Sequence, residues 1–172
     1  MNPAASPNFI LTLKISDADH VALTGLRREY FPPERNFLEA HVTLFHKLPG
    51  DLRERWFADL ETVGRLASAF RVHFGEPYTL GRGFALRVES PPLAALRGQL
   101  VKSWFDFLSP QDRQKFNPHC TIQNKVEPAQ AKADLESFRA GWRPLESRAL
   151  GFQLWEYLNG PWRLEKEWLF KP

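Results

Sequence analysis

Two short segments of this 172-residue chain share the pattern His, any residue, Thr, aliphatic residue: residues 41–44 read HVTL and residues 119–122 read HCTI. Side chains two residues apart in a strand lie on one face, so each segment would place an imidazole beside a hydroxyl. Histidine accepts or donates a proton near neutral pH, and a hydroxyl donates a hydrogen bond to an oxyanion. Together the two segments therefore indicate acid–base chemistry on a phosphate group.

The two segments take equivalent places in a repeated order of predicted elements. Their histidines lie 78 residues apart, 119 minus 41, and a lysine stands six residues after each of them. After a first strand, the order helix, strand, helix, strand, strand occurs twice, which indicates an internal duplication. Hydrophobic periodicity and breaker residues predict helices over 17–30, 51–67, 91–108 and 128–140, and strands over 9–15, 39–46, 70–74, 84–88, 118–124, 148–157 and 162–170.

Local sequence signals predict how three of these elements begin or turn. Ser16 with Asp19 three residues later predicts a variant of the capping box at the start of the first helix. Ser90 followed by two prolines predicts a helix start with proline at its first position. Asn159-Gly160 is the favoured two-residue turn of a hairpin between the last two strands.

A pseudo-two-fold axis between the halves would bring His41 and His119 together across a central groove. One neutral imidazole would remove a proton from the attacking oxygen, and one imidazolium would protonate the leaving oxygen. Thr43 and Thr121 would donate hydrogen bonds to the non-bridging phosphate oxygens. The chemistry requires neither a metal nor a cofactor, and the symmetry leaves open which histidine is the base.

The paired motifs resemble the signature of the 2H phosphoesterase superfamily, and most closely its 2′-5′ RNA ligase-like and cyclic phosphodiesterase members. The resemblance covers both motifs, their spacing and the order of elements along nearly the whole chain. It implies an α+β fold whose duplicated halves form two antiparallel sheets that line a central groove, with helices outside. It also implies His41 and His119 as the acid–base pair and Thr43 and Thr121 as phosphate ligands.

The resemblance further implies an activity and its partners. The implied reactions are metal-independent hydrolysis of 2′,3′-cyclic phosphates and the making or breaking of 2′-5′ phosphodiester bonds. The implied substrates are RNA ends or small cyclic or 2′-5′-linked nucleotides. The alternative function is a nucleotide- or RNA-binding module that uses the same groove without turnover. Two His-x-Thr sets favour the enzyme, because binding alone needs no second proton-transfer group.

Several other side chains are candidates for substrate contact. Phe45 shares the predicted face of the first motif and could stack on a base or support the groove wall. Lys47 and Lys125 lie about 20 Å from their histidines on an unbroken strand, so phosphate contact would require a bend. Arg82, between two glycines, could reach a nucleotide phosphate or simply belong to a turn. Trp155 is on a face, shared with Tyr157, that could line the groove or pack within the fold.

A zinc site is the main alternative for the histidines, and the sequence does not favour it. The chain lacks a His-Glu-x-x-His helix, and its single cysteine, Cys120, falls on the predicted core face of its strand. The net charge of +3 permits an anionic ligand without requiring one.

The bulk composition predicts one bilobal domain over residues 1–172, with a short tail at about residues 1–7. With 43% hydrophobic residues, the chain can bury a substantial core. Its apolar runs are too short for a membrane span, and its first residues do not have the pattern of a signal peptide. With one cysteine, these features predict a cytoplasmic protein, which we expect to be a monomer.

Overall fold

A computed structural model describes residues 7–172 of the chain, so the expected tail at about residues 1–7 lies almost entirely outside the described residues. The structure has four 14-residue α-helices, and every predicted helix and strand is present. The strands are β1 Asn8–Ile15, β2 Thr43–Pro49, β3 Phe70–Thr79, β4 Phe84–Glu89, β5 His119–Gln123, β6 Leu145–Tyr157 and β7 Trp162–Leu169. The helices are α1 Asp17–Tyr30, α2 Arg53–Leu66, α3 Pro91–Trp104 and α4 Pro128–Gly141.

All seven described strands belong to one antiparallel sheet with the order β2-β1-β6-β3-β4-β5, and β7 pairs with β6. The expected α+β class with duplicated halves is therefore confirmed. The six-strand path is pseudo-symmetric, because each half contributes three strands in an equivalent order. In one half β1 lies between β2 and β6, and in the other half β4 lies between β5 and β3. Short pairing between residues 70–74 and 145–149 joins the two expected sheets into one.

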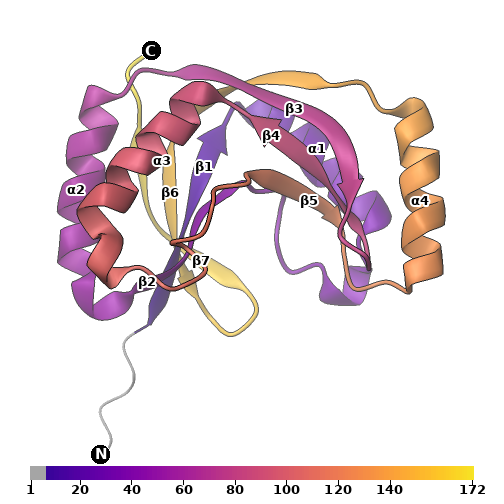
Figure 1. The fold of residues 1–172 in the computed structure, drawn as a ribbon, viewed down its shortest axis with the longest axis horizontal. Helices are drawn as coiled ribbons and strands as arrows, with labels where there is room; N and C mark the ends of the chain where they lie inside the picture. The colour runs from indigo at the N-terminus through magenta and orange to yellow at the C-terminus, as the bar shows by residue number, and fades with distance from the viewer. Residues whose placement is uncertain (1–6) are drawn as a thin grey trace, which may run out of the picture.

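The helices cross between the halves. Helix α1 precedes β2 in the chain but packs on β5, whereas α3 precedes β5 and brings Trp104 against Phe45 of β2. Figure 1 shows α2 and α3 together at the left of the view and α4 at the right, with β3 and β4 spanning the distance between them. Each half therefore depends on a helix from the other half for its cover.

The core explains why these segments form their elements. Aliphatic residues of β1 and β2 and large aromatic side chains from α2, α3, β3 and β6 are fully buried, among them Trp56, Trp104, Phe74 and Phe152. Removing such rings from water is the main driving force for the fold. None of the helices in residues 7–172 has the length and apolar character needed to cross a lipid bilayer.

The predicted capping signals have different outcomes. The Ser90 hydroxyl accepts a hydrogen bond from the Leu93 amide, as an N-cap should. Ser16 occupies the predicted N-cap position, but the expected side-chain cap is absent, because its hydroxyl donates to the Asp19 carboxylate and accepts nothing from the helix. The ionised Asp19 carboxylate is a strong acceptor, and the Ser16 hydroxyl donates its hydrogen bond to it.

The predicted turns are both present. Asn159 and Gly160 have positive φ angles of 59° and 152°, so they form the tight connection between β6 and β7. In the other turn, Gly81 has a φ of 82°, and a Cβ atom on Gly83 would lie 1.9 Å from the Gln123 carbonyl oxygen. The glycines on either side of Arg82 are therefore required for the chain to turn and for β4 to approach β5.

Candidate active site

The main chain orients the two motif histidines in the same way. Nδ1 of His41 lies 2.8 Å from the Glu39 carbonyl oxygen, and Nδ1 of His119 lies 3.0 Å from the Asn117 carbonyl oxygen. A carbonyl oxygen only accepts hydrogen bonds, so Nδ1 must carry the proton in both rings. Nε2 is then a proton acceptor in a neutral imidazole and a proton donor in an imidazolium.

Each motif is followed by a β-bulge at the same place. Thr12 pairs with Thr43 while Leu11 pairs with Phe45, so Leu44 is an extra residue in β2. In β5 the same shift makes the residue after Thr121 extra, since residues 84 and 85 pair with 123 and 121. Bulges bend a strand and change the direction of its side chains. Both motifs therefore keep His and Thr on one face while the next two residues are buried.

The two threonines have different neighbours across the sheet. Thr43 of β2 is opposite Thr12 of β1, whereas Thr121 of β5 is opposite Ala85 of β4. The Thr12 hydroxyl accepts a hydrogen bond of 2.8 Å from the Trp155 indole N–H, which leaves its own proton free to donate. The first half therefore offers a hydroxyl beside its motif threonine, where the second half has a methyl group.

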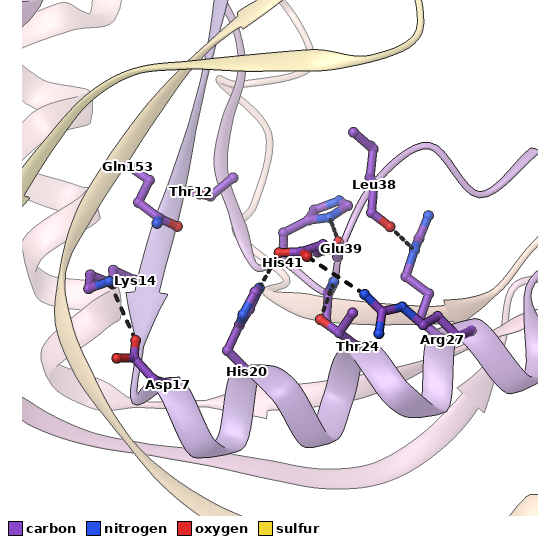
Figure 2. A network of polar contacts seen from close by, with 12 residues as sticks. Thr12, Lys14, Asp17, His20, Thr24, Arg27, Leu38, Glu39, His41 and Gln153 are labelled. Carbon is purple, nitrogen blue, oxygen red and sulfur yellow. Dashed lines mark hydrogen bonds and ion pairs between the residues drawn. The ribbon is translucent and has the colours of Figure 1, made fainter.

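Two buried arginines connect each motif to the other half. Arg27 of α1 donates to the Leu38 carbonyl, which precedes the first motif, and to the Thr121 carbonyl in the second, both at 3.0 Å. Arg97 of α3 donates to the Leu44 carbonyl in the first motif at 2.8 Å. Figure 2 shows Arg27 of α1 directed toward the segment that carries Leu38. These hydrogen bonds fix the position of one motif strand relative to the opposite half.

The two motifs lie close to each other in the structure. The main-chain N–H of His41 approaches the sulfur of Cys120, which lies between His119 and Thr121. A cavity of about 40 Å³ is lined by both His41 and Cys120. Burial raises the pKa of the Cys120 thiol to about 11, so this cysteine is a packing residue rather than a nucleophile. The structure thus brings together the two segments that share the motif.

Electrostatics distinguish the first histidine. Burial lowers the pKa of His41 to about 4, although the hydrogen bond to the Glu39 carbonyl opposes this effect. The positive charges of Arg27, His119 and His46 lower the pKa further. In the ligand-free protein at neutral pH, His41 is therefore an uncharged imidazole with an available Nε2.

The structure places Phe45 away from the motif face, so its predicted role in substrate stacking is wrong. Phe45 is fully buried, 5.1 Å from the Trp104 ring and 4.8 Å beneath the Arg97 guanidinium. The bulge at Leu44 is the physical reason, because an extra residue reverses the side on which every later side chain lies.

The three basic residues that the sequence suggested for substrate contact are exposed. Lys47 is exposed on β2, where its amide donates to the Asp112 carboxylate at 3.0 Å. Lys125 follows the end of β5 in a turn with a φ of 67°. Arg82 is 58% exposed, and its Nε donates to the Val126 carbonyl at 3.1 Å. Arg82 therefore connects two turns, as its structural interpretation predicts.

The surroundings of His41 include residues that the motif search did not identify. The Trp162 ring lies 4.7 Å from the His41 ring, and Trp155, which the sequence did suggest, lies 6.3 Å from Trp162. A cavity of about 200 Å³ opens here, bordered also by Phe37 and Gln153. Figure 2 shows Gln153 on the strand beside Thr12, facing the region of His41. The only sequence signal for Trp162 was its position as an aromatic residue just after the Asn-Gly turn.

Metal-binding groups do not gather at this site. Within residues 7–172, no group of three or more His, Cys, Asp or Glu side chains is close enough to hold a metal ion.

Comparison with known proteins finds solved structures with the same fold. The chain resembles solved structures of TT0787 from Thermus thermophilus (TM-score 0.69, 17% identity, 95% of this chain and 98% of that one) and of E. coli LigT complexed with 3′-AMP (TM-score 0.66, 16% identity, 96% and 99%). A structure described as a phosphoesterase has a TM-score of 0.61 at 18% identity and covers 96% of this chain and 99% of its own. At such identities these likenesses show the fold. No curated protein sequence matches the chain.

The sequence model of the 2′-5′ RNA ligase superfamily matches residues 15–161, a span that contains both His-x-Thr motifs and both arginines that hold them. The chain therefore belongs to the 2′-5′ RNA ligase superfamily, within the 2H phosphoesterases.

Proposed function

We propose that the protein is a phosphodiesterase that acts on RNA ends or small nucleotides by two-histidine acid–base catalysis, without a metal. Its reactions are the hydrolysis of 2′,3′-cyclic phosphates and the breaking or making of 2′-5′ phosphodiester bonds. The observation that carries this proposal is the matched Nδ1 hydrogen bond of His41 and His119, because it leaves an Nε2 atom free in each half.

Each reaction uses the same two proton transfers. When a 2′-5′ bond is broken, the ribose 3′-oxygen attacks phosphorus and loses its proton to one imidazole. The 5′-oxygen of the next nucleoside leaves with a proton from the other imidazole, and a 2′,3′-cyclic phosphate is formed. Water then attacks the cyclic phosphate and loses a proton to the imidazole that protonated the 5′-oxygen. One ribose oxygen leaves phosphorus as the ring opens and takes up a proton from the imidazole beside the ribose. The histidine beside the ribose is therefore a base in the first reaction and an acid in the second.

The threonines supply the remaining catalytic contribution. Negative charge gathers on the non-bridging oxygens during phosphoryl transfer, and hydroxyl groups already directed at them stabilise it. Thr43 and Thr121 follow their histidines by two residues on the same face and are partly exposed. LigT of E. coli, which shares the fold, has been solved with 3′-AMP and with phosphate, ligands that contain the groups this mechanism requires.

The test is turnover of 2′,3′-cyclic AMP and of 2′-5′-linked diadenosine, followed by chromatography of the products. We expect both substrates to react at an unchanged rate after exhaustive chelation with EDTA. Activity that is lost on chelation and restored by one divalent ion would contradict the metal-free mechanism. Binding of both nucleotides with no product would instead support a binding module with no catalytic function.

A further inference from the structure

The cavity beside His41 has aromatic walls from two separate parts of the chain. Phe37 comes from the segment that leads into the first motif, Trp155 from β6 and Trp162 from the start of β7. The Phe37 side chain is 62% exposed, although phenylalanine is usually buried. Trp155 is held in place by the hydrogen bond from its indole N–H to Thr12. The walls therefore combine a fixed ring, a ring in contact with His41 and an unpacked ring at the opening.

Such walls suit a flat heterocycle. Bases stack on exposed aromatic rings in a way that tolerates their sequence, because every base has a π-face. The cavity volume of about 200 Å³ is smaller than the roughly 300–1,000 Å³ of pockets for drug-sized ligands. One base fits this description better than a whole dinucleotide, and its ribose phosphate would extend toward His41.

Two polar side chains of the cavity, Gln153 and Glu39, offer hydrogen-bond acceptors. Gln153 uses its side-chain N–H to donate to Glu167 at 2.9 Å, so its amide oxygen remains as an acceptor. Glu39 adds a carboxylate that is 63% exposed and lies 3.5 Å from Nε2 of His20. Acceptors at the edge of a base recognise exocyclic amino groups, which adenine and cytosine have and uracil lacks.

The region around His119 is less suited to a base. Its nearest aromatic neighbour is Tyr78, whose ring lies 6.4 Å away in an edge-on arrangement. The Arg87 guanidinium lies over the Tyr78 ring, 5.0 Å from its centre, and so occupies one face of that ring. The surroundings of the two equivalent histidines therefore differ, although the motifs that carry these histidines match.

We propose that the cavity between Phe37, Trp155 and Trp162 binds the nucleobase of the substrate, with a preference for bases that carry an amino group. The ribose attached to this base then lies beside His41, and the water or second nucleoside lies on the side of His119. This inference rests on the proposed function for the position of the phosphate, and it adds where the base of the nucleotide binds and which bases are preferred.

The test measures binding, so it does not depend on turnover. Isothermal titration calorimetry compares 3′-AMP with ribose 3-phosphate, which has the same phosphate and sugar but no base. We expect the wild-type protein to bind 3′-AMP more tightly. In Phe37→Ala and Trp162→Ala, the ratio of the two affinities should fall by about 5- to 150-fold, the usual loss of one base–aromatic contact. Because a ratio is used, any effect on the phosphate site cancels.

Two control variants and a second base sharpen the test. Phe105→Ala removes a ring that is 51% exposed and stacked under Arg113, so the ratio should not change. Gln153→Leu should reduce the preference for 3′-AMP over 3′-UMP while binding of ribose 3-phosphate is retained. An equal affinity of the wild-type protein for 3′-AMP and ribose 3-phosphate would overturn the proposal. So would a ratio that falls in Tyr78→Ala but not in Phe37→Ala.

The two proposals can fail separately. If the affinity ratio behaves as expected but neither 2′,3′-cyclic AMP nor 2′-5′-linked diadenosine is turned over, the base site stands and the proposed activity is wrong. If both substrates are turned over but the ratio is the same in every variant, the activity stands and the base site is wrong.

Discussion

The half of the molecule around His41 and the half around His119 share their framework and differ in what surrounds it. Both histidines bond to the carbonyl two residues earlier, and both motifs end in a bulge. The environment of His41 adds Trp162 and an adjoining cavity, whereas His119 has only Tyr78 beneath Arg87. In the proposed mechanism the shared features would serve proton transfer and phosphate binding, which are needed on both sides of a phosphate. The differences would serve recognition, since the groups on the two sides of the phosphate are not alike.

The largest expected effect tests the shared part of this comparison. His41→Ala and His119→Ala should each reduce kcat by about 10²–10⁴-fold, because each removes one of the two proton transfers. The double variant should lose little more than either single variant, since the two groups act as a unit. Turnover of 2′,3′-cyclic AMP measures this effect, with thermal melts to verify folding. Near-normal activity in either folded single variant would contradict the acid–base assignment.

The arginines test whether the halves are held together symmetrically. Arg27→Met and Arg97→Met should each lower the free energy of unfolding by roughly 3 kcal/mol, because each leaves buried carbonyl groups without donors. Urea unfolding measures this loss. Arg28→Met, at a position 71% exposed on the same helix as Arg27, should change it by less than about 0.5 kcal/mol. A loss for one arginine alone would show that only one half depends on its partner's helix.

The threonines test the difference in their neighbours. Thr121→Ala should reduce kcat/KM by about 10-fold, because it removes one hydrogen bond to the phosphate and no proton transfer. Thr43→Ala should have a smaller effect, since Thr12 lies directly opposite and can donate to the same oxygens. The double variant Thr12→Val, Thr43→Ala should then lose as much kcat/KM as Thr121→Ala does. Equal losses in the two single variants would show that Thr12 contributes nothing.

The pH dependence tests the electrostatic character of His41. The sequence alone predicts that both limbs of a bell-shaped profile fall at about pH 5–8. With the pKa of His41 lowered to about 4, the limb due to His41 should move to about pH 4. Where His41 is the base, kcat/KM falls below that pH because the imidazole becomes protonated. Where it is the acid, kcat/KM falls above that pH because the proton is lost.

Two substrates together show whether His41 acts as a base or as an acid. With a base bound beside His41, 2′-5′-linked diadenosine should show the first behaviour and 2′,3′-cyclic AMP the second. Stopped assays from about pH 3.5 to about pH 9 measure both profiles. Identical profiles for the two substrates would show that His41 does not exchange its role.

Much of the candidate site was already determined by the sequence. The two His-x-Thr motifs, their offset and the repeated element order predicted the duplicated α+β fold, because alternation in strands and 3.6-residue periodicity in helices are local properties of the chain. The Asn159-Gly160 turn and the Ser90 cap were predicted for the same reason, since a turn or a cap depends on a few adjacent residues. The pairing of one motif with the other followed from their equivalence under duplication.

Only the tertiary structure decided what each motif contacts. Arg27 and Arg97 look like ordinary helix residues until the crossing of α1 and α3 places them against the opposite strands. Phe45 was assigned to the wrong face because a bulge depends on the register between two strands, which no single strand reveals. Trp162 reaches His41 only because β7 folds back along β6. Contacts between distant segments depend on how strands pair and helices cross, so the sequence determined the candidate catalytic groups and the fold determined their surroundings.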